Sequence, residues 1–265
     1  MKVGICGICG RMGVSILKLA LDRGHTLAAA FDHEGAPQFG LDAGVLAGAG
    51  DTGVTVRNVN AEDAGRCDCL VDFSSPAAAM PMLEAALAMK KPLVIGTTGL
   101  SADAIDRIRK ASASIPVLFS PNMSLGVNLL FKLTEVAAGA LSPDYDVEIF
   151  EAHHRFKKDA PSGTARRLLE IVKSGMNGLG GAKEVTGRNG MTGERTRNEV
   201  GILAMRGGDI VGEHTVYFTG IGERIELTHR ATSREILSKG AVSALEFLAG
   251  KPAGLYSMYD VLGFK

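Results

Sequence analysis

The stretch EAHHRFKKDAPSGTA, residues 151 to 165, combines proton-transferring side chains with a possible anion site. It contains two adjacent histidines and two adjacent lysines: His153, His154, Lys157 and Lys158. A proline and Ser162 follow, and they predict the start of a helix. A helix N-terminus attracts carboxylate or phosphate through its N–H groups and its dipole, and a nearby lysine adds charge or a proton. The stretch predicts acid–base chemistry on an anionic substrate; the alternative is a strand histidine with satisfied hydrogen bonds and a solvated lysine pair.

A second candidate site is GICGICGRMG, residues 4 to 13, where glycines recur at every third position. Such a loop suits the pyrophosphate of a dinucleotide, whereas Cys6 and Cys9 form a C-x-x-C frame typical of metal or redox sites. A dinucleotide loop must follow a first strand, open a helix and precede an acidic residue about 20 positions later. The apolar run 2–6, a helical pattern from about residue 11, and Asp32 after a second apolar run meet these requirements. We therefore predict a dinucleotide site, with a glycine-rich turn that binds no ligand as the alternative.

The four cysteines are predicted to be small buried hydrophobic residues without a metal or a disulfide. Cys67 and Cys69 flank the start of a predicted strand, and strand alternation would turn both sulfurs to the same side. This spacing alone does not exclude a metal. A zinc or thiol redox protein built on Cys6 and Cys9 therefore remains an alternative.

Strand and helix patterns alternate from residue 1 to about 140, and the strands are almost entirely apolar. This is the pattern of a parallel sheet with helices on both faces. The predicted strands are 2–6, 26–33, 68–74, 92–99 and 115–124, and the predicted helices are 11–24, 76–90, 101–114 and 126–141.

The pattern changes after residue 140, where closely spaced strands predict a mostly open sheet of mixed direction. The predicted elements are a strand at 144–154, a helix at 162–173, a polar glycine-rich stretch at 174–198, strands at 200–207, 210–220 and 223–231, and a helix at 233–249. That helix and the tail at 254–264 are expected to return to the first domain. We predict a dinucleotide-binding domain at 1–124 plus 234–265, and a substrate-binding and oligomerisation domain at 125–233.

Composition limits the possible partners. The 265 residues include 29 basic and 29 acidic side chains, so no overall field attracts nucleic acid or an anionic membrane. No apolar run approaches the ~18 residues of a membrane span. The start MKVGICG lacks the apolar stretch of a signal peptide, and a cytoplasmic location is expected.

The chain resembles the 4-hydroxy-tetrahydrodipicolinate reductase (dihydrodipicolinate reductase) family of the diaminopimelate route to lysine. The resemblance rests on GRMG at 10–13, GTTG at 96–99, the stretch at 151–165 and GDIVGEHTVYF at 208–218, which occur in family order. It implies a Rossmann-like domain, a smaller α+β substrate domain with a mixed sheet, and a homotetramer. It also implies hydride transfer from NADH or NADPH to a small cyclic dicarboxylate, giving tetrahydrodipicolinate.

The resemblance also implies roles for individual residues. His153 is the acid–base residue and Lys157 the proton donor, which leaves Lys158 outside the family's lysine position. The implied substrate residues are His154, Gly163 and Thr164. The implied cofactor residues are Gly7, Ile8, Cys9, Gly10, Arg11, Met12, Asp32, His33, Gly96, Thr97, Thr98, Ser120, Pro121, Asn122 and Met123.

Three positions depart from the family pattern. The family often has Glu at Asp32, Arg at His33 and Phe at Met123. A carboxylate at Asp32 repels a 2′-phosphate, so NADH is expected to serve at least as well as NADPH. Another NAD(P)-dependent oxidoreductase of the same two-domain plan, such as an amino-acid dehydrogenase, and a non-catalytic nucleotide sensor are the remaining alternatives.

Overall fold

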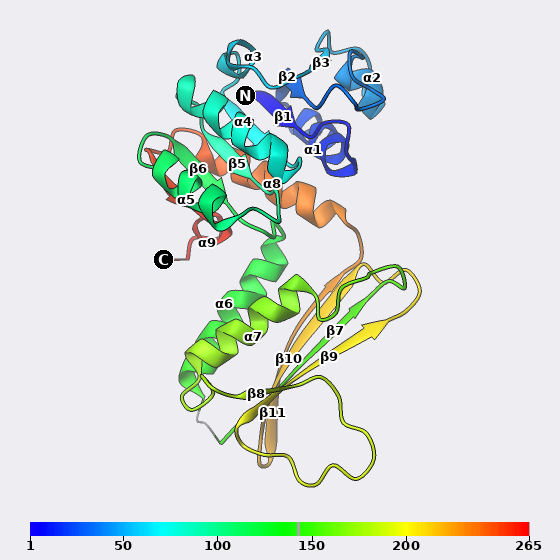
Figure 1. Cartoon of the computed structure of the whole chain (residues 1–265), viewed down its shortest axis with the longest axis vertical. Coiled ribbons are helices and arrows are strands. Elements are labelled where there is room, and N and C mark those ends of the chain that lie inside the picture. Colours follow the sequence, from blue (N-terminus) through cyan, green and yellow to red (C-terminus); the bar gives the residue numbers. More distant parts are fainter. Residues whose placement is uncertain (142–143, 265) are drawn as a thin grey trace. The chain divides into compact units, whose positions relative to one another are not determined.

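The computed structural model describes residues 1–141 and 144–264. The chain divides into two compact units, Met1–Leu125 with Glu235–Lys265, and Gly126–Arg234. Residues 142–143 and 265, which belong to the predicted domain ranges, lie outside the described residues. Figure 1 labels most of the elements of both units.

The first unit is built on a sheet of seven strands within the described residues, and all its strand pairs are parallel. The order is β12-β6-β5-β4-β1-β2-β3. The strands are β1 (Lys2–Cys6), β2 (Thr26–Phe31), β3 (Val56–Arg57), β4 (Cys69–Asp72), β5 (Leu93–Ile95), β6 (Pro116–Phe119) and β12 (Gly254–Tyr256). The parallel sheet predicted from the apolar strands is confirmed, and the tail returns to it through β12.

Helices cover both faces of this sheet, as Figure 1 shows. One face packs against α1 (Arg11–Asp22), α2 (Ala43–Ala47) and α8 (Glu235–Leu248), and the other against α3 (Ala61–Gly65), α4 (Pro76–Ala88) and α5 (Ala102–Ala111). Successive strand residues point to opposite faces, so Ile5 joins the first core and Cys6 the second. Both faces are buried, which is why the strands read as continuous apolar runs.

The predicted orientation of Cys67 and Cys69 is wrong. Cys69 is the first residue of β4 and packs in the core beside α1 and α8, whereas Cys67 packs in the core beside α3 and α4. Strand alternation does not apply to this pair because Cys67 precedes the strand. The two sulfurs therefore lie on opposite faces of the sheet.

The second unit has a mixed five-stranded sheet within the described residues, in the order β11-β10-β7-β9-β8. Its strands are β7 (Asp146–His153), β8 (Lys183–Val185), β9 (Glu199–Arg206), β10 (Gly212–Gly220) and β11 (Glu223–Ala231). Strands β7, β8 and β9 run parallel, and β10 is antiparallel to both β7 and β11. Helix α7 (Gly163–Gly175) packs on β7, and it lies beside α6 (Leu125–Ala140) in Figure 1. The predicted mixed sheet is confirmed.

The short elements α2, β3, α3, β8, β12 and α9 (Met258–Val261) are absent from the predicted set. Each has two to five residues, too few to show a helical or strand period. Strand β8 lies inside the polar stretch 174–198 and exists because it pairs with β9.

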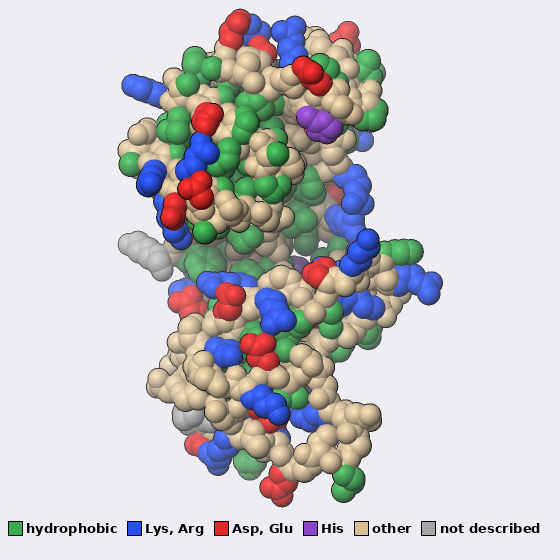
Figure 2. Space-filling model, viewed as in Figure 1, with side chains coloured by type: hydrophobic (Ala, Val, Ile, Leu, Met, Phe, Trp, Pro, Cys, Tyr) green, Lys and Arg blue, Asp and Glu red, His purple; other side chains and the backbone are tan. Residues whose placement is uncertain are grey.

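Charged side chains of both signs are interspersed over most of the face drawn in Figure 2. This agrees with the zero net charge of the chain. In the part of the chain that the structure describes, no helix is long and apolar enough to cross a membrane.

Candidate active site

The glycine loop lies between β1 and α1, at the carboxyl end of a central strand. Gly7 has a φ of +81°, a conformation that favours glycine, and its N–H donates to Phe31 O at 2.9 Å. A Cβ on Gly7 would overlap the carbonyl oxygen of Phe73. A Cβ on Gly13 would overlap the carbonyl oxygen of Gly7 and lie 2.6 Å from Ile8 Cα. These glycines therefore let the first turn of α1 pack directly on the loop, as the nucleotide prediction requires.

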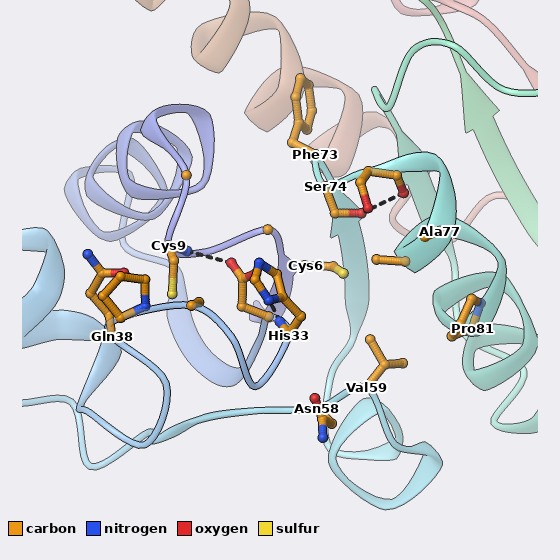
Figure 3. Close-up of a pocket in the computed structure, with 17 residues that line it drawn as sticks. Cys6, Cys9, His33, Gln38, Asn58, Val59, Phe73, Ser74, Ala77 and Pro81 are labelled. Carbon is orange, nitrogen blue, oxygen red and sulfur yellow. Dashed lines mark hydrogen bonds and ion pairs between the residues drawn. The ribbon is translucent and has the colours of Figure 1, made fainter.

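A pocket of about 840 Å³ opens beside this loop. It lies where strand order reverses, between β1 with β2 on one side and β4 on the other, which is where parallel α/β sheets bind ligands. In Figure 3, Cys9 and Gln38 lie on one side of the pocket, Ala77 and Pro81 of α4 on the other, and His33 between them. The lining residues are Cys6, Gly7, Cys9, Gly10, Asp32, His33, Ala36, Pro37, Gln38, Asn58, Val59, Phe73, Ser74, Ser75, Ala77, Ala78 and Pro81.

Asp32 follows β2 and reaches the glycine loop. Its Oδ2 accepts a hydrogen bond from Cys9 N at 2.9 Å, and its Oδ1 accepts one from His33 N at 2.9 Å. Figure 3 shows the bond to Cys9. The carboxylate is thus fixed at the wall of the pocket, and the side chain of His33 beside it is 74% exposed. A ribose hydroxyl could still bond this carboxylate, because each oxygen has a second lone pair.

The other predicted cofactor residues lie outside the lining of this pocket: Ile8 in the glycine loop, Arg11 and Met12 at the start of α1, and the residues that follow β5 and β6. Since neighbouring parallel strands end at one edge of a sheet, Gly96–Thr98 and Ser120–Met123 share the edge that carries the glycine loop. Gly96 packs against the Phe73 ring, which leaves no space for a Cβ. Ile8 and Met123 are at most 1% exposed and belong to the core, so only their backbones can face a ligand.

Asp72, a residue that the sequence prediction missed, joins three of these strand ends. It is fully buried at the end of β4 and accepts hydrogen bonds from Ser74 Oγ and, at 2.7 Å, from Thr97 Oγ1. Burial raises the pKa of its carboxyl group, and the hydroxyl donors and the Cys6 thiol oppose that shift. A lone acidic residue that ends an apolar strand run is a signal that could have identified it.

The environments of Cys6 and Cys9 do not favour thiolate chemistry. Cys6 is buried in the core beside α3 and α4, and Cys9 packs against the opposite core. Burial raises the pKa of both thiols, to about 11 for Cys9, and the nearby carboxylates Asp72 and Asp32 raise them further. Among the described residues, no cluster of three or more His, Cys, Asp or Glu side chains could hold a metal ion.

We therefore expect Cys6→Ser and Cys9→Ala, alone or combined, to keep turnover within a few-fold of the parent enzyme. Both thiols stay protonated near neutral pH, so neither serves as a nucleophile or a ligand. Steady-state kinetics and zinc analysis of the purified variants check this. Stoichiometric zinc that disappears together with activity in the double variant would contradict it.

In the second unit, the neighbouring strands β9 and β10 each bring one residue to the histidine-containing end of β7. Glu151 and His153 are two residues apart on β7 and so point to the same face. In the strand register, Arg206 of β9 lies beside His153, and His214 of β10 lies beside Glu151. The rings of His153 and His214 meet edge to face, 5.2 Å apart.

Glu151 is the fully buried centre of this cluster. Its Oε2 lies 2.6 Å from His153 Nδ1 and accepts from Arg206 Nη1 at 2.7 Å. Its Oε1 accepts from Arg206 Nη2 at 2.8 Å and from the N–H of Ser162 at 3.0 Å. Burial alone would raise the pKa of Glu151, but the bonds from Arg206, His153 and Ser162 outweigh it and hold the pKa below its usual range. The carboxyl group is therefore ionised.

Helix α7 begins beside this carboxylate. Ser162 is its N-cap, and Ser162 Oγ accepts from Ala165 N at 3.2 Å and lies 3.0 Å from His214 Nε2. The positive end of the helix dipole thus falls at Gly163 and Thr164, the residues predicted to bind a substrate carboxylate. Burial lowers the pKa of His214 to about 3, so His214 is neutral near pH 7.

The two lysines have different environments. Lys157 is 20% exposed, and its Nζ donates to Asp159 Oδ1 at 2.9 Å, whereas Lys158 is exposed. Burial lowers the pKa of His153; the charges of Lys157 and Arg206 add to this effect, and Glu151 opposes it. His154 Nε2 accepts from Arg234 Nη2 at 3.0 Å. Lys157 is thus close enough to His153 for its charge to lower the pKa of His153, whereas Lys158 is exposed to solvent.

Two family domains match the chain. "Dihydrodipicolinate reductase, N-terminus" matches residues 1–123, and "Dihydrodipicolinate reductase, C-terminus" matches residues 126–262. Curated relatives described as 4-hydroxy-tetrahydrodipicolinate reductase include those of Trichlorobacter lovleyi (45% identical, covering 100% of both chains) and Geobacter sulfurreducens (45%, 100% of this chain and 99% of that one). The relative from Cupriavidus necator is 47% identical and covers 100% of both chains.

Solved structures share the fold. A dipicolinate-bound dihydrodipicolinate reductase from Paenisporosarcina sp. TG-14 is 21% identical, with a TM-score of 0.77 over 98% of both chains. An amine dehydrogenase from Mycobacterium smegmatis is 14% identical, with a TM-score of 0.58 over 97% of this chain and 95% of that one. These likenesses support the α/β fold with a Rossmann-like first unit and a second unit on a mixed sheet.

Proposed function

The chain belongs to the dihydrodipicolinate reductase family, and from that premise we propose that it reduces 4-hydroxy-tetrahydrodipicolinate to tetrahydrodipicolinate with NAD(P)H. The observation that carries the proposal is the juxtaposition of His153 with an α7 N-terminus suited to a carboxylate, both held by one buried glutamate. The reaction belongs to the diaminopimelate route to lysine. Identity near 45% over the full chain favours this substrate over an amino-acid dehydrogenase or a non-catalytic sensor.

The first unit fits the proposed cofactor. Gly7 and Gly13 leave a cradle that side chains would fill, and the first-turn N–H groups of α1 have no partners within the helix. We propose that these groups bind the pyrophosphate and that Asp32 binds the ribose. The bound nicotinamide supplies the hydride.

The second unit would bind the dicarboxylate and move the proton. We propose that His154 and the α7 start at Gly163 and Thr164 hold a substrate carboxylate. Hydride addition to the conjugated imine, formed when the hydroxy substrate loses water, places negative charge on the substrate. Lys157 would then donate a proton from its ammonium group, with His153 as the acid–base partner, a role worth ~10²–10⁴-fold. NAD(P)H, one proton and the hydroxy substrate thus give tetrahydrodipicolinate, NAD(P)⁺ and water.

A coupled assay tests this function directly. Freshly generated 4-hydroxy-tetrahydrodipicolinate is added to the purified enzyme with NADH, and the loss of NADH absorbance is followed. Omitting the substrate-generating enzyme gives the background rate. Substrate-dependent oxidation is expected, and its absence with fully folded protein would exclude the proposed reaction.

NADH is expected to be used at least as well as NADPH, because the carboxylate of Asp32 repels a 2′-phosphate. His33→Arg should improve the use of NADPH, since it adds about one charge-assisted hydrogen bond, ~1.5–3 kcal/mol at most. KM and kcat for both cofactors check the result. His25→Arg adds the same charge to the same unit outside the pocket lining and should leave the ratio unchanged. A large NADPH preference in the unmodified enzyme would show that Asp32 does not set the choice.

We further propose that the two compact units are the predicted dinucleotide and substrate domains, and that the enzyme is a cytoplasmic homotetramer. Met205 on β9, an apolar residue that is 44% exposed, supports assembly through the second sheet. Sedimentation of the purified protein measures the oligomeric state.

A further inference from the structure

Glu151 is not among the residues proposed to bind substrate or transfer protons. Its carboxylate nevertheless has contacts that a glutamate in a strand ordinarily lacks. Its carboxylate is 0% exposed and receives hydrogen bonds from Arg206 of β9 and from the N-cap of α7, while it faces His153 of its own strand. All four partner atoms lie between 2.6 and 3.0 Å. An ionised carboxylate offers acceptors only, so the nitrogen of His153 that faces it must carry a proton.

We infer that Glu151 is a positioning residue of the reductase: it holds neutral His153 as the Nδ1–H tautomer and fixes the ring relative to the start of α7. The inference rests on the proposed function, because it assigns a purpose to the orientation of His153. With the proton on Nδ1, the lone pair of Nε2 is the one available for acid–base work. Nε2 of His153 lies against Gly212, the first residue of β10. A Cβ at position 212 would come within 3.0 Å of this nitrogen, so the glycine leaves space for the His153 ring.

The charges around His153 support a neutral ring at rest. Glu151 on the same strand favours the imidazolium, whereas Arg206 on β9 and Lys157 in the turn disfavour it, and His214 on β10 meets the ring edge. Burial is the largest effect and lowers the pKa of His153. The tautomer of the neutral ring is therefore the relevant state near pH 7.

Glu151→Gln is the informative substitution. The side chain keeps its size and one carbonyl oxygen, which can still accept from Ser162 N and Arg206. The new NH₂ group can only donate, so it loses the hydrogen bond from Arg206 Nη1, and it would bond a deprotonated Nδ1 and move the proton of His153 to Nε2. Glu148→Gln on the same strand is the matched control, because Glu148 bonds Arg188 and Arg195 instead of the cluster.

Two readouts are combined. The enzyme is labelled with ¹⁵N-histidine, and the signals of His153 are identified as those that disappear in His153→Ala. Their chemical shifts report which ring nitrogen carries the proton. We expect Nδ1–H in the parent and in Glu148→Gln, and Nε2–H in Glu151→Gln. In steady-state kinetics, Glu151→Gln should lower kcat by about 10- to 100-fold, less than His153→Ala, with the NADH dissociation constant unchanged.

Several results would overturn the inference. Nε2–H in the parent enzyme would do so, whatever happens to the variant, and this measurement stands even if Glu151→Gln fails to fold. Nδ1–H retained in a folded Glu151→Gln, or a kcat equal to that of the parent, would also contradict it. Absence of reductase activity in the parent would instead refute the proposed function, and the tautomer measurement would remain valid because it requires no turnover.

Discussion

Lys157→Ala is expected to lower kcat by ~10²-fold or more while NADH binding stays the same. The ammonium group is held by Asp159 in the turn after β7, close enough to lower the pKa of His153. Removing it deprives the transition state of its proposed proton donor. The proposed NADH site lies in the other unit, so its affinity should not respond. Steady-state kinetics with the coupled assay and fluorescence titration of NADH measure the two quantities.

Two further variants test whether the effect is specific to Lys157 and whether Lys157 acts as a proton donor or only as a positive charge. Lys158→Ala removes an exposed neighbour of the same type and should cost little. Lys157→Arg keeps the charge but cannot release a proton in practice, so it should remain defective. Near-normal turnover in Lys157→Ala, or equal damage in Lys158→Ala, would show that the lysine assignment is wrong. Full activity in Lys157→Arg would mean that the charge alone matters.

Gly13→Ala is expected to raise the NADH dissociation constant at least ~10-fold. The added Cβ would overlap the carbonyl oxygen of Gly7 and lie 2.6 Å from Ile8 Cα. Both neighbours are backbone, so the loop or the first turn of α1 must move. Each lost hydrogen bond to a charged pyrophosphate costs ~1.5–3 kcal/mol. Fluorescence titration of NADH measures the loss.

The same substitution at Gly139 is the control. Gly139 lies in helix α6, and a Cβ there meets nothing within 4 Å. Alanine in a helix is otherwise favoured over glycine by ~1 kcal/mol, so Gly139→Ala should keep NADH affinity and thermal stability. Parental NADH affinity in a folded Gly13→Ala would show that the close approach of α1 to the loop is not needed for binding.

Much of the first unit could be predicted because each of its strands is buried on both faces. Ile5 and Cys6 enter opposite cores, and both must be apolar, so the strands stand out as short apolar runs between helices. The elements between residues 40 and 66 could not be predicted, because β3 has two residues and depends on β2 for its hydrogen bonds. The predicted orientation of Cys67 is wrong for a related reason. Strand β4 begins at Cys69, so Cys67 lies before the strand and strand alternation does not apply to it.

The sequence by itself determined the residue types of both candidate sites, because glycines at fixed spacing and histidines before a helix cap are local patterns. It also determined the alternation of strands and helices in the first unit. Only the tertiary structure decided which of these residues are held together. A glutamate in a half-exposed strand ordinarily faces water, and the sequence prediction left Glu151 without a role. Strand register brings Arg206 and His214 to it, and the start of α7 adds the N–H of Ser162. These contacts join segments far apart in the chain, and a buried charge is stable only where such partners meet it.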